Sequence, residues 1–338
     1  MEQSRFSCKG VGMILIGIVG LALVFDFLNG VHGSSNIVGT MISSRAFSPR
    51  MALFITALAE FTGPFLFGAA VAHTIGSEIV QANVITLDIL LASLVGSILW
   101  NIITWSNGIP SSSSHSLVGG LIGAAWVGAG IRSLLLPGLL KMVAALFAAP
   151  FIGFGISFLV TRLVYALASN STPRINEFFK HGQLFTSLVL AASHGANDAQ
   201  KTMGVIVLAM VISGSLPVFS VPLWVIFVSA AGMALGTLLA GWQLIRTVGT
   251  KFYKIRPVHS FSAQLASALV LLGSSMFGWP VSATHIVSSA IVGSGSAERF
   301  GKIRWGVAGE MVTSWIITIP ASAIFSAGVY WLLTNFLH

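Results

Sequence analysis

The chain has 338 residues, of which 55% are hydrophobic and only 8% are charged, and its mean hydropathy is +0.91. A soluble domain averages about 25% charged residues, so this composition excludes a soluble globular protein and predicts an integral membrane protein. The single cysteine, Cys8, excludes an internal disulfide framework and a multi-cysteine metal site. The net charge of +8 comes from basic residues in short loops, which indicates control of membrane topology and no nucleic-acid partner.

Apolar runs long enough to cross a bilayer recur along the chain. A spanning helix needs about 20 such residues, and runs of this kind cover residues 11–28, 51–72, 87–105, 134–160, 221–244 and 307–333. The first run follows Arg5 and Lys9 but has no small-residue cleavage site, so it is interpreted as a retained helix and not as a signal peptide. We predict an all-α membrane protein with about ten helical membrane segments, including broken helices and helical hairpins.

Three polar motifs occur twice in the same order. NGVHGSSNIVGT at residues 29–40 matches HGANDAQKTMGV at 194–205, with Gly30 and Gly39 aligned to Gly195 and Gly204 at one constant offset. Further along, three glycines (Gly63, Gly68 and Gly76) match three others (Gly236, Gly241 and Gly249). GIPSSSSHSLVGGLIG at 108–123 then matches GWPVSATHIVSSAIVG at 278–293. We therefore predict a duplication, with a first repeat at 11–132, a connecting helix and linker at 133–181, and a second repeat at 182–335. Residues 174–183 are interpreted as the linker itself.

Loop charge predicts that the two repeats have opposite orientations. The loop after the first motif carries Arg45 and Arg50, whereas the matching loop at 213–222 has no basic residue. One loop later the bias reverses, because residues 73–86 have no Lys or Arg and residues 246–259 have four. Cytoplasmic loops are enriched in Lys and Arg, so 45–50, 162–180, 246–256 and 299–304 are assigned to the cytoplasm. Both termini of this multi-pass protein of the cell membrane are then outside.

Inverted repeats in a multispanning chain are typical of secondary transporters, because two mirror-related halves can open in turn to either side. No G-x-x-x-x-G-K-[ST] motif occurs, so we expect no ATP hydrolysis by this chain.

The paired Pro-Ser/Thr-His segments predict an anion site. Proline suits the first turn of a helix, and serines cap its free N–H groups. A helix that begins at membrane depth presents those N–H groups and its positive dipole end to a bound anion. The candidate anion ligands are Ser112, Ser113, Ser114, His115, Ser282, Thr284 and His285. The alternative for each segment is a helix cap at the membrane interface. The alternative for each histidine is a packing role.

The second candidate site is the polar motif at 194–205 with its copy. A charged group at membrane depth costs about 2.5 to 3.5 kcal/mol on insertion scales, so Asp198 needs a cation, a proton or a partner. Lys201 is interpreted as an anion ligand. Alternatively, it is the counter-ion of Asp198, or its side chain extends to the membrane interface. The candidate cation-coupling residues are Asp26, Asn29, Asn36, Asn197, Asp198 and Gln200, where amide oxygens and carbonyls of a glycine-broken helix would suit a sodium ion. Glu60 and Glu310 are either proton carriers or buried structural partners.

These motifs resemble the inorganic phosphate transporter family. The resemblance extends from Leu21 to Ala321 and rests on FDFLNGVHGSSNIVGTMISSRAFSP, GIPSSSSHSLVGGLIG, SHGANDAQKTMGV and GWPVSATHIVSSAIVGSGSAERFGKIRWG. Members of that family are low-affinity permeases that take up phosphate with protons or sodium. The resemblance implies an inverted-repeat carrier that binds substrate and coupling ion where its halves meet.

One departure from the family pattern falls inside the first motif. The family usually has an aspartate in NGFHDxxN, where this chain has Gly33, while Asp198 is kept in the second half. The sequence therefore predicts that a Gly33→Asp change raises the transport rate or its sodium dependence.

The sequence favours a symporter of inorganic phosphate and a cation, with a proton preferred to sodium and no other cofactor. Sulfate or another tetrahedral oxyanion is the alternative substrate, and membrane lipid and a homodimer are compatible partners. An ion channel and an intramembrane hydrolase built on Ser193, His194 and Asp198 are remote alternatives. Adjacent Ser and His residues on a helix point about 100° apart, which makes a poor catalytic triad, so we expect no enzyme.

Overall fold

A computed structural model describes residues 2–336 except 82, 110, 173 and 240–254. For residues 2–10, 34, 36 and 302 it describes the backbone alone. Several residues used above therefore lie outside the described ones: Pro110, the glycines at 241 and 249, and the basic residues Arg246, Lys251 and Lys254.

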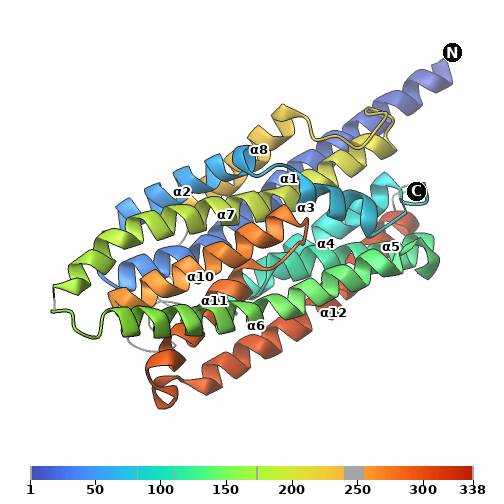
Figure 1. The fold of residues 1–338 in the computed structure, drawn as a ribbon. Coiled ribbons are helices and arrows are strands. Elements are labelled where there is room, and N and C mark those ends of the chain that lie inside the picture. The colour runs from blue at the N-terminus through green and yellow to red at the C-terminus, as the bar shows by residue number, and fades with distance from the viewer. Residues whose placement is uncertain (1, 82, 110, 173, 240–254, 337–338) are drawn as a thin grey trace.

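The described chain consists of helices and contains no strand, which confirms the all-α prediction (Figure 1). In the first part of the chain the helices are α1 (Glu2–Ser43), α2 (Pro49–Leu66), α3 (Ala70–His73), the π-helical turn η1 (Thr74–Glu78), α4 (Leu87–Ser106), α5 (Ser113–Ala129) and α6 (Leu136–Leu167). The later ones are α7 (Ile175–Ile212), α8 (Leu223–Leu238), α10 (Pro257–Met276), α11 (Ala283–Glu298) and α12 (Trp305–Phe336).

Four described helices are long and apolar enough to cross a membrane, at Val11–Ser43, Leu87–Ser106, Leu136–Leu167 and Trp305–Phe336. A fifth span forms if α2 and the Ala70–Glu78 segment, which meet at a bend of 72°, are taken together. The protein is thus a multi-pass membrane protein. The total of about ten segments stays a prediction. Helix α8 has only 16 residues, and polar side chains interrupt the apolar sequence of α7.

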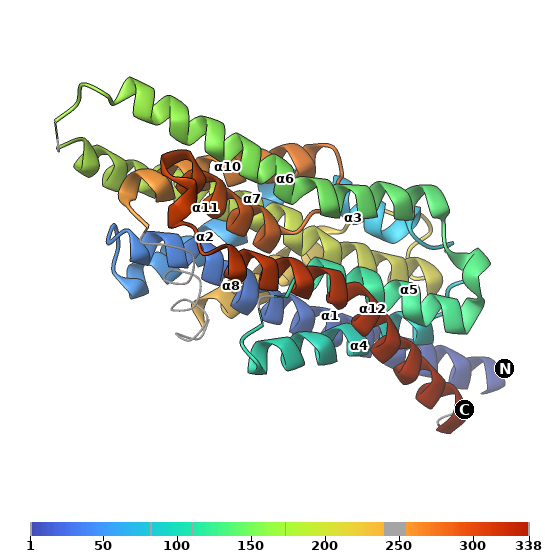
Figure 2. The same ribbon diagram turned by 90° about the horizontal axis from the view of Figure 1, so that it is seen from below.

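Matching helices of the two sequence halves have matching neighbours. Helix α1 packs on α8 and α4, and α7 packs on α2 and α10. Helix α5 packs on α4 and α12, just as α11 packs on α10 and α6. Figure 1 shows that α1 and α7 run in opposite directions, and Figure 2 shows α12 crossing the bundle in front of α4 and α5.

The helices that carry the polar motifs are continuous, so the expectation of a glycine break within residues 194–205 is wrong. The glycines serve close packing. A Cβ on Gly195 would lie against the backbone of Glu60 in α2, and a Cβ on Gly30 would lie against the backbone of Met233 in α8. Each motif helix therefore approaches a neighbouring backbone more closely than any other residue would permit.

The expected linker between the two halves also changes. Residues 175–183, assigned above to a linker, form the first turns of α7, so the connection from α6 is shorter than expected.

Three connections lie at one end of the bundle in Figure 1, opposite both termini. They are the turn after α1, the connection between α6 and α7, and the turn between α11 and α12. The real interruptions at the site are the turns between α4 and α5 and between α10 and α11.

Candidate functional site

Two helix N-termini meet inside the bundle. Ser112 caps α5 by accepting a hydrogen bond from the His115 backbone N–H at 3.3 Å, and Ser282 caps α11 by accepting one from His285 at the same distance. The Ser112 hydroxyl also donates to the Ser282 hydroxyl at 2.9 Å. The predicted caps are thus confirmed, although Pro280 precedes the cap of α11 and does not lie in its first turn. Since a helix N-terminus attracts anions, the junction concentrates positive potential.

Hydroxyl groups of α5 extend this junction toward α1 and α7. Ser113 donates a hydrogen bond to Asn29 of α1. Ser114 donates to the Val281 carbonyl at 3.1 Å and accepts from Lys201 of α7 at 2.6 Å. All of the predicted anion ligands are buried here, with Thr284, at 9% relative exposure, the most accessible of them. The structure therefore brings residues from four helices to one enclosed place.

The two predicted histidines lie side by side behind the caps, with their rings tilted by 41° to one another. The ring centroids of His115 and His285 are 4.4 Å apart, and His285 stacks on Trp315 at 3.8 Å. The Nδ1 atom of His115 lies 2.9 Å from the Ser112 hydroxyl. Both imidazoles are therefore held in place by neighbours that also shape the junction.

A chain of buried ionisable side chains runs along α7. Lys201 forms an ion pair with Asp198, and the second carboxylate oxygen of Asp198 lies 3.2 Å from Nε2 of His194. The other ring nitrogen of His194 lies 2.7 Å from Glu60 of α2. Each of these side chains is at most 4% exposed, so Lys201 does not reach the membrane interface. Buried charges are tolerated when they are paired and hydrogen-bonded in this way.

The remaining predicted cation residues are not all together. Asp26 of α1 accepts a hydrogen bond from Thr202 at 2.6 Å, which places it against α7. Asn197 donates to the Ser275 hydroxyl at 3.1 Å, toward α10. Gln200 lies apart, because its amide oxygen accepts the Val71 backbone N–H at 2.9 Å. The side chain of Asn36 lies outside the described residues.

Comparisons with known proteins agree with this arrangement. The family model described as "Phosphate transporter family" matches residues 29–326. The chain belongs to the phosphate transporter family.

Relatives within the phosphate transporter family extend over almost the whole chain. A protein of Rhizobium meliloti (strain 1021) is 41% identical, with 94% of this chain and 96% of the relative covered. One of Bacillus subtilis (strain 168) is 39% identical, with 95% and 97% covered. Both are named "Probable low-affinity inorganic phosphate transporter". The fold is similar to a solved structure titled "The sodium-dependent phosphate transporter", with a TM-score of 0.86, 24% identity, and 96% of this chain and 100% of that chain covered. These relatives are named as transporters, in agreement with the expectation that the chain is not an enzyme.

The sequence analysis did not predict the ion pair between Glu60 and His194. Glu60 was suspected as an acid within an apolar run, but nothing in the sequence joined it to His194 or to Thr237, which donates a hydrogen bond to it. The Ser193 hydroxyl donates to the Val189 carbonyl of its own helix, so the hydrolase trio does not assemble in this structure.

The structure shows what a side chain at position 33 would contact. A Cβ at this position would lie against the imidazole of His194. An aspartate there collides with the ring that bridges Glu60 and Asp198, and the predicted gain from Gly33→Asp therefore does not follow from the geometry.

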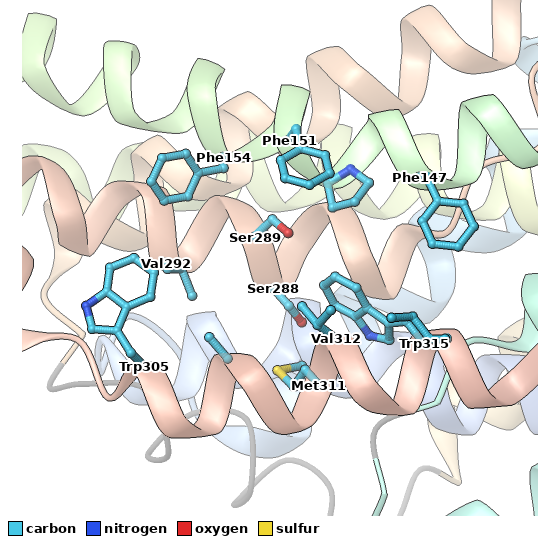
Figure 3. Close-up of a pocket in the computed structure, with 13 residues that line it drawn as sticks. Phe147, Phe151, Phe154, Ser288, Ser289, Val292, Trp305, Met311, Val312 and Trp315 are labelled. Atoms are coloured by element: carbon cyan, nitrogen blue, oxygen red, sulfur yellow. The ribbon is translucent and has the colours of Figure 1, made fainter.

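An apolar cavity of about 240 Å³ lies beside the junction, between α6, α11 and α12 (Figure 3). Phe147, Phe151 and Phe154 line one side, and Trp315 lines the other. Trp315 separates this cavity from His285, on which it stacks. The predicted anion ligands do not line it, so the cavity is distinct from the polar site.

Proposed function

We propose that this protein carries inorganic phosphate across the cell membrane in symport with a cation, by alternating access of two inverted halves. The observation that carries the proposal is the meeting of the α5 and α11 N-termini beside the buried ammonium of Lys201. Two helix dipoles, serine hydroxyls and one cation suit an anion with several oxygens. The names of the relatives support phosphate as that anion.

The proposed phosphate ligands are the hydroxyl groups and free N–H groups at the two helix starts. In this closed arrangement they bond to one another, as in the pairs of Ser112 with Ser282 and Ser113 with Asn29. A bound phosphate would replace these contacts by hydrogen bonds to its own oxygens. His115, Thr284 and His285 would complete the cage, and Lys201 would balance part of the charge.

Alternating access is supported by the paired packing of the two halves. Gly30 faces α8 and Gly195 faces α2, at matching positions of helices that run in opposite directions (Figure 1). We place in the cytoplasm the end of the bundle that holds the turn after α1 and the connection between α6 and α7, because Arg45, Arg50 and Arg174 lie in or next to these segments. Both termini are then outside. Movement of one half against the other would then open the junction to one side at a time.

The proposed coupling cation binds near Asp198, with Asp26, Asn29, Asn36, Asn197 and Gln200 as further candidate ligands. A proton is favoured, because the amide oxygens of Gln200 and Asn29 already accept hydrogen bonds within the protein, and among the described candidate amides only the oxygen of Asn197 lacks a partner.

The test is uptake of labelled phosphate into proteoliposomes under separately imposed proton and sodium gradients. We expect saturable uptake that a gradient accelerates. Absence of uptake under both gradients would refute the proposal, and conduction that does not saturate would indicate a channel.

Sulfate is the second candidate substrate, because cages of hydroxyl and N–H donors bind either tetrahedral oxyanion. Competition by unlabelled sulfate and arsenate during phosphate uptake distinguishes the two. Stronger inhibition by sulfate than by unlabelled phosphate would assign the site to sulfate.

A further inference from the structure

The ammonium group of Lys201 lies in a shell of three oxygen atoms from three separate segments. It pairs with the Asp198 carboxylate on its own helix, and it donates to the Ser114 hydroxyl of α5 and the Val281 carbonyl before α11, both at 2.6 Å. The Lys201 residue is 2% exposed. A carboxylate, a hydroxyl and a carbonyl are the hard oxygen donors that bind small metal cations. The ammonium therefore occupies the position of a bound cation.

The other half of the repeat has no such group. At the constant offset that aligns Gly30 with Gly195, Lys201 corresponds to Asn36, and Asp198 corresponds to Gly33. A neutral amide thus matches the lysine, so the duplicated backbone does not itself require a cationic side chain at this position.

The second oxygen of Asp198 is also occupied from within the protein. Nε2 of His194 approaches it at 3.2 Å, and the ring fills the space next to Gly33. The other ionisable groups near this carboxylate are Glu60 of α2, which holds the far side of the ring, and Asp26 of α1. Both oxygens of the acid in this motif therefore already face a nitrogen atom of the protein, one from Lys201 and one from His194.

We infer that Lys201 is a built-in cation that takes the place of sodium at Asp198, so that transport by this chain does not require sodium. The inference rests on the proposed function and specifies its coupling ion. In this arrangement the tethered ammonium neutralises Asp198 and excludes a bound metal ion by its charge and its volume. A chain with a neutral side chain at this position would have to recruit a free cation to the same oxygens.

The test replaces the lysine by the residue of the matching half, Lys201→Asn, and measures phosphate uptake in sodium and in choline buffers. We expect wild-type uptake to differ by less than about twofold between the buffers, and uptake by Lys201→Asn to be at least about tenfold faster in sodium, since binding of a free ion follows mass action. Lys141→Asn is the matched control, because Lys141 also pairs with a carboxylate, Glu78 at 2.9 Å, but lies away from the junction.

A second measurement keeps the test decisive if the variant transports poorly. The unfolding temperature in detergent is recorded with sodium chloride and with choline chloride, and we expect a rise in sodium of several degrees for Lys201→Asn alone. The inference would be overturned if wild-type uptake required sodium. It would also be overturned if neither the uptake nor the unfolding temperature of Lys201→Asn depended on sodium. Absence of phosphate uptake by the wild type would instead reject the proposed function, while a sodium effect on unfolding confined to Lys201→Asn would still support the built-in cation.

Discussion

Between residues 26–40 and 191–205 the two matching motif helices differ in ionisable side chains at five aligned positions. Helix α7 has His194, Asp198 and Lys201 where α1 has Asn29, Gly33 and Asn36, and α1 has Asp26 and His32 where α7 has Ala191 and Asn197. The backbone arrangement is nevertheless kept, because Gly30 and Gly195 make matching close contacts with α8 and α2. Close packing limits both copies to small residues at the glycines, while the polar positions between them are free to diverge.

This difference concentrates the ionic chemistry on α7, one of the two motif helices, with acids from the first half beside it. The network from Glu60 to Lys201 lies on α7 and its neighbour α2, and α1 contributes Asp26 at a position where α7 has Ala191. The anion junction is more even, because Ser112 and Ser282 cap their helices in the same way. The two halves are therefore alike where substrate is proposed to bind and unlike where the cation is.

The largest expected effect comes from Asp198→Asn. This change removes the carboxylate from the position that aligns with Gly33, so that neither motif helix carries an acid there. It leaves Lys201 as a buried unpaired cation, at a cost of about 3 to 5 kcal/mol for a broken buried pair. We expect gradient-driven phosphate uptake to fall by about two orders of magnitude and the unfolding temperature to drop. The double change Asp198→Asn with Lys201→Asn removes both charges and should recover the unfolding temperature. Normal gradient dependence in the single variant would remove Asp198 from the mechanism.

An intermediate effect is expected from Gly33→Asp, which gives the first half the carboxylate it lacks. The new side chain must displace the His194 ring from Asp198, and we expect uptake to fall by about tenfold, the range for a forced shift in a packed site. Combining it with His194→Asn, the residue at the matching position of α1, makes room and should restore part of the rate. A faster single variant would show that the ring moves away freely.

The smallest effects are expected at the paired hydroxyl positions Ser114 and Thr284. Loss of one hydrogen bond to phosphate costs about 1 kcal/mol, so each change to alanine should raise KM for phosphate by about fivefold. Ser114→Ala should have the larger effect, because Ser114 also accepts from Lys201. Ser106→Ala, at the exposed end of α4, is the control. Equal KM values in all three variants would exclude these hydroxyl groups from the site.

The helical membrane fold and most of the polar site could be predicted from the sequence. Composition and apolar runs depend on the chain alone, and the serine caps follow from local backbone chemistry, so Ser112 and Ser282 were found correctly. The continuity of α1 and α7 was not found, because a glycine in a polar motif fits a helix break and a close helix contact equally well.

The sequence by itself determined that the protein lies in a membrane, that its motifs occur twice and that one copy has an acid where the other has Gly33. Only the tertiary structure decided what surrounds that acid. Glu60 and Ser114 are far from Asp198 along the chain, and helix packing brings them to His194 and Lys201. A buried charge is destabilising unless it is paired with an opposite charge. For this reason the ammonium of Lys201 pairs with Asp198 and does not extend to the membrane surface.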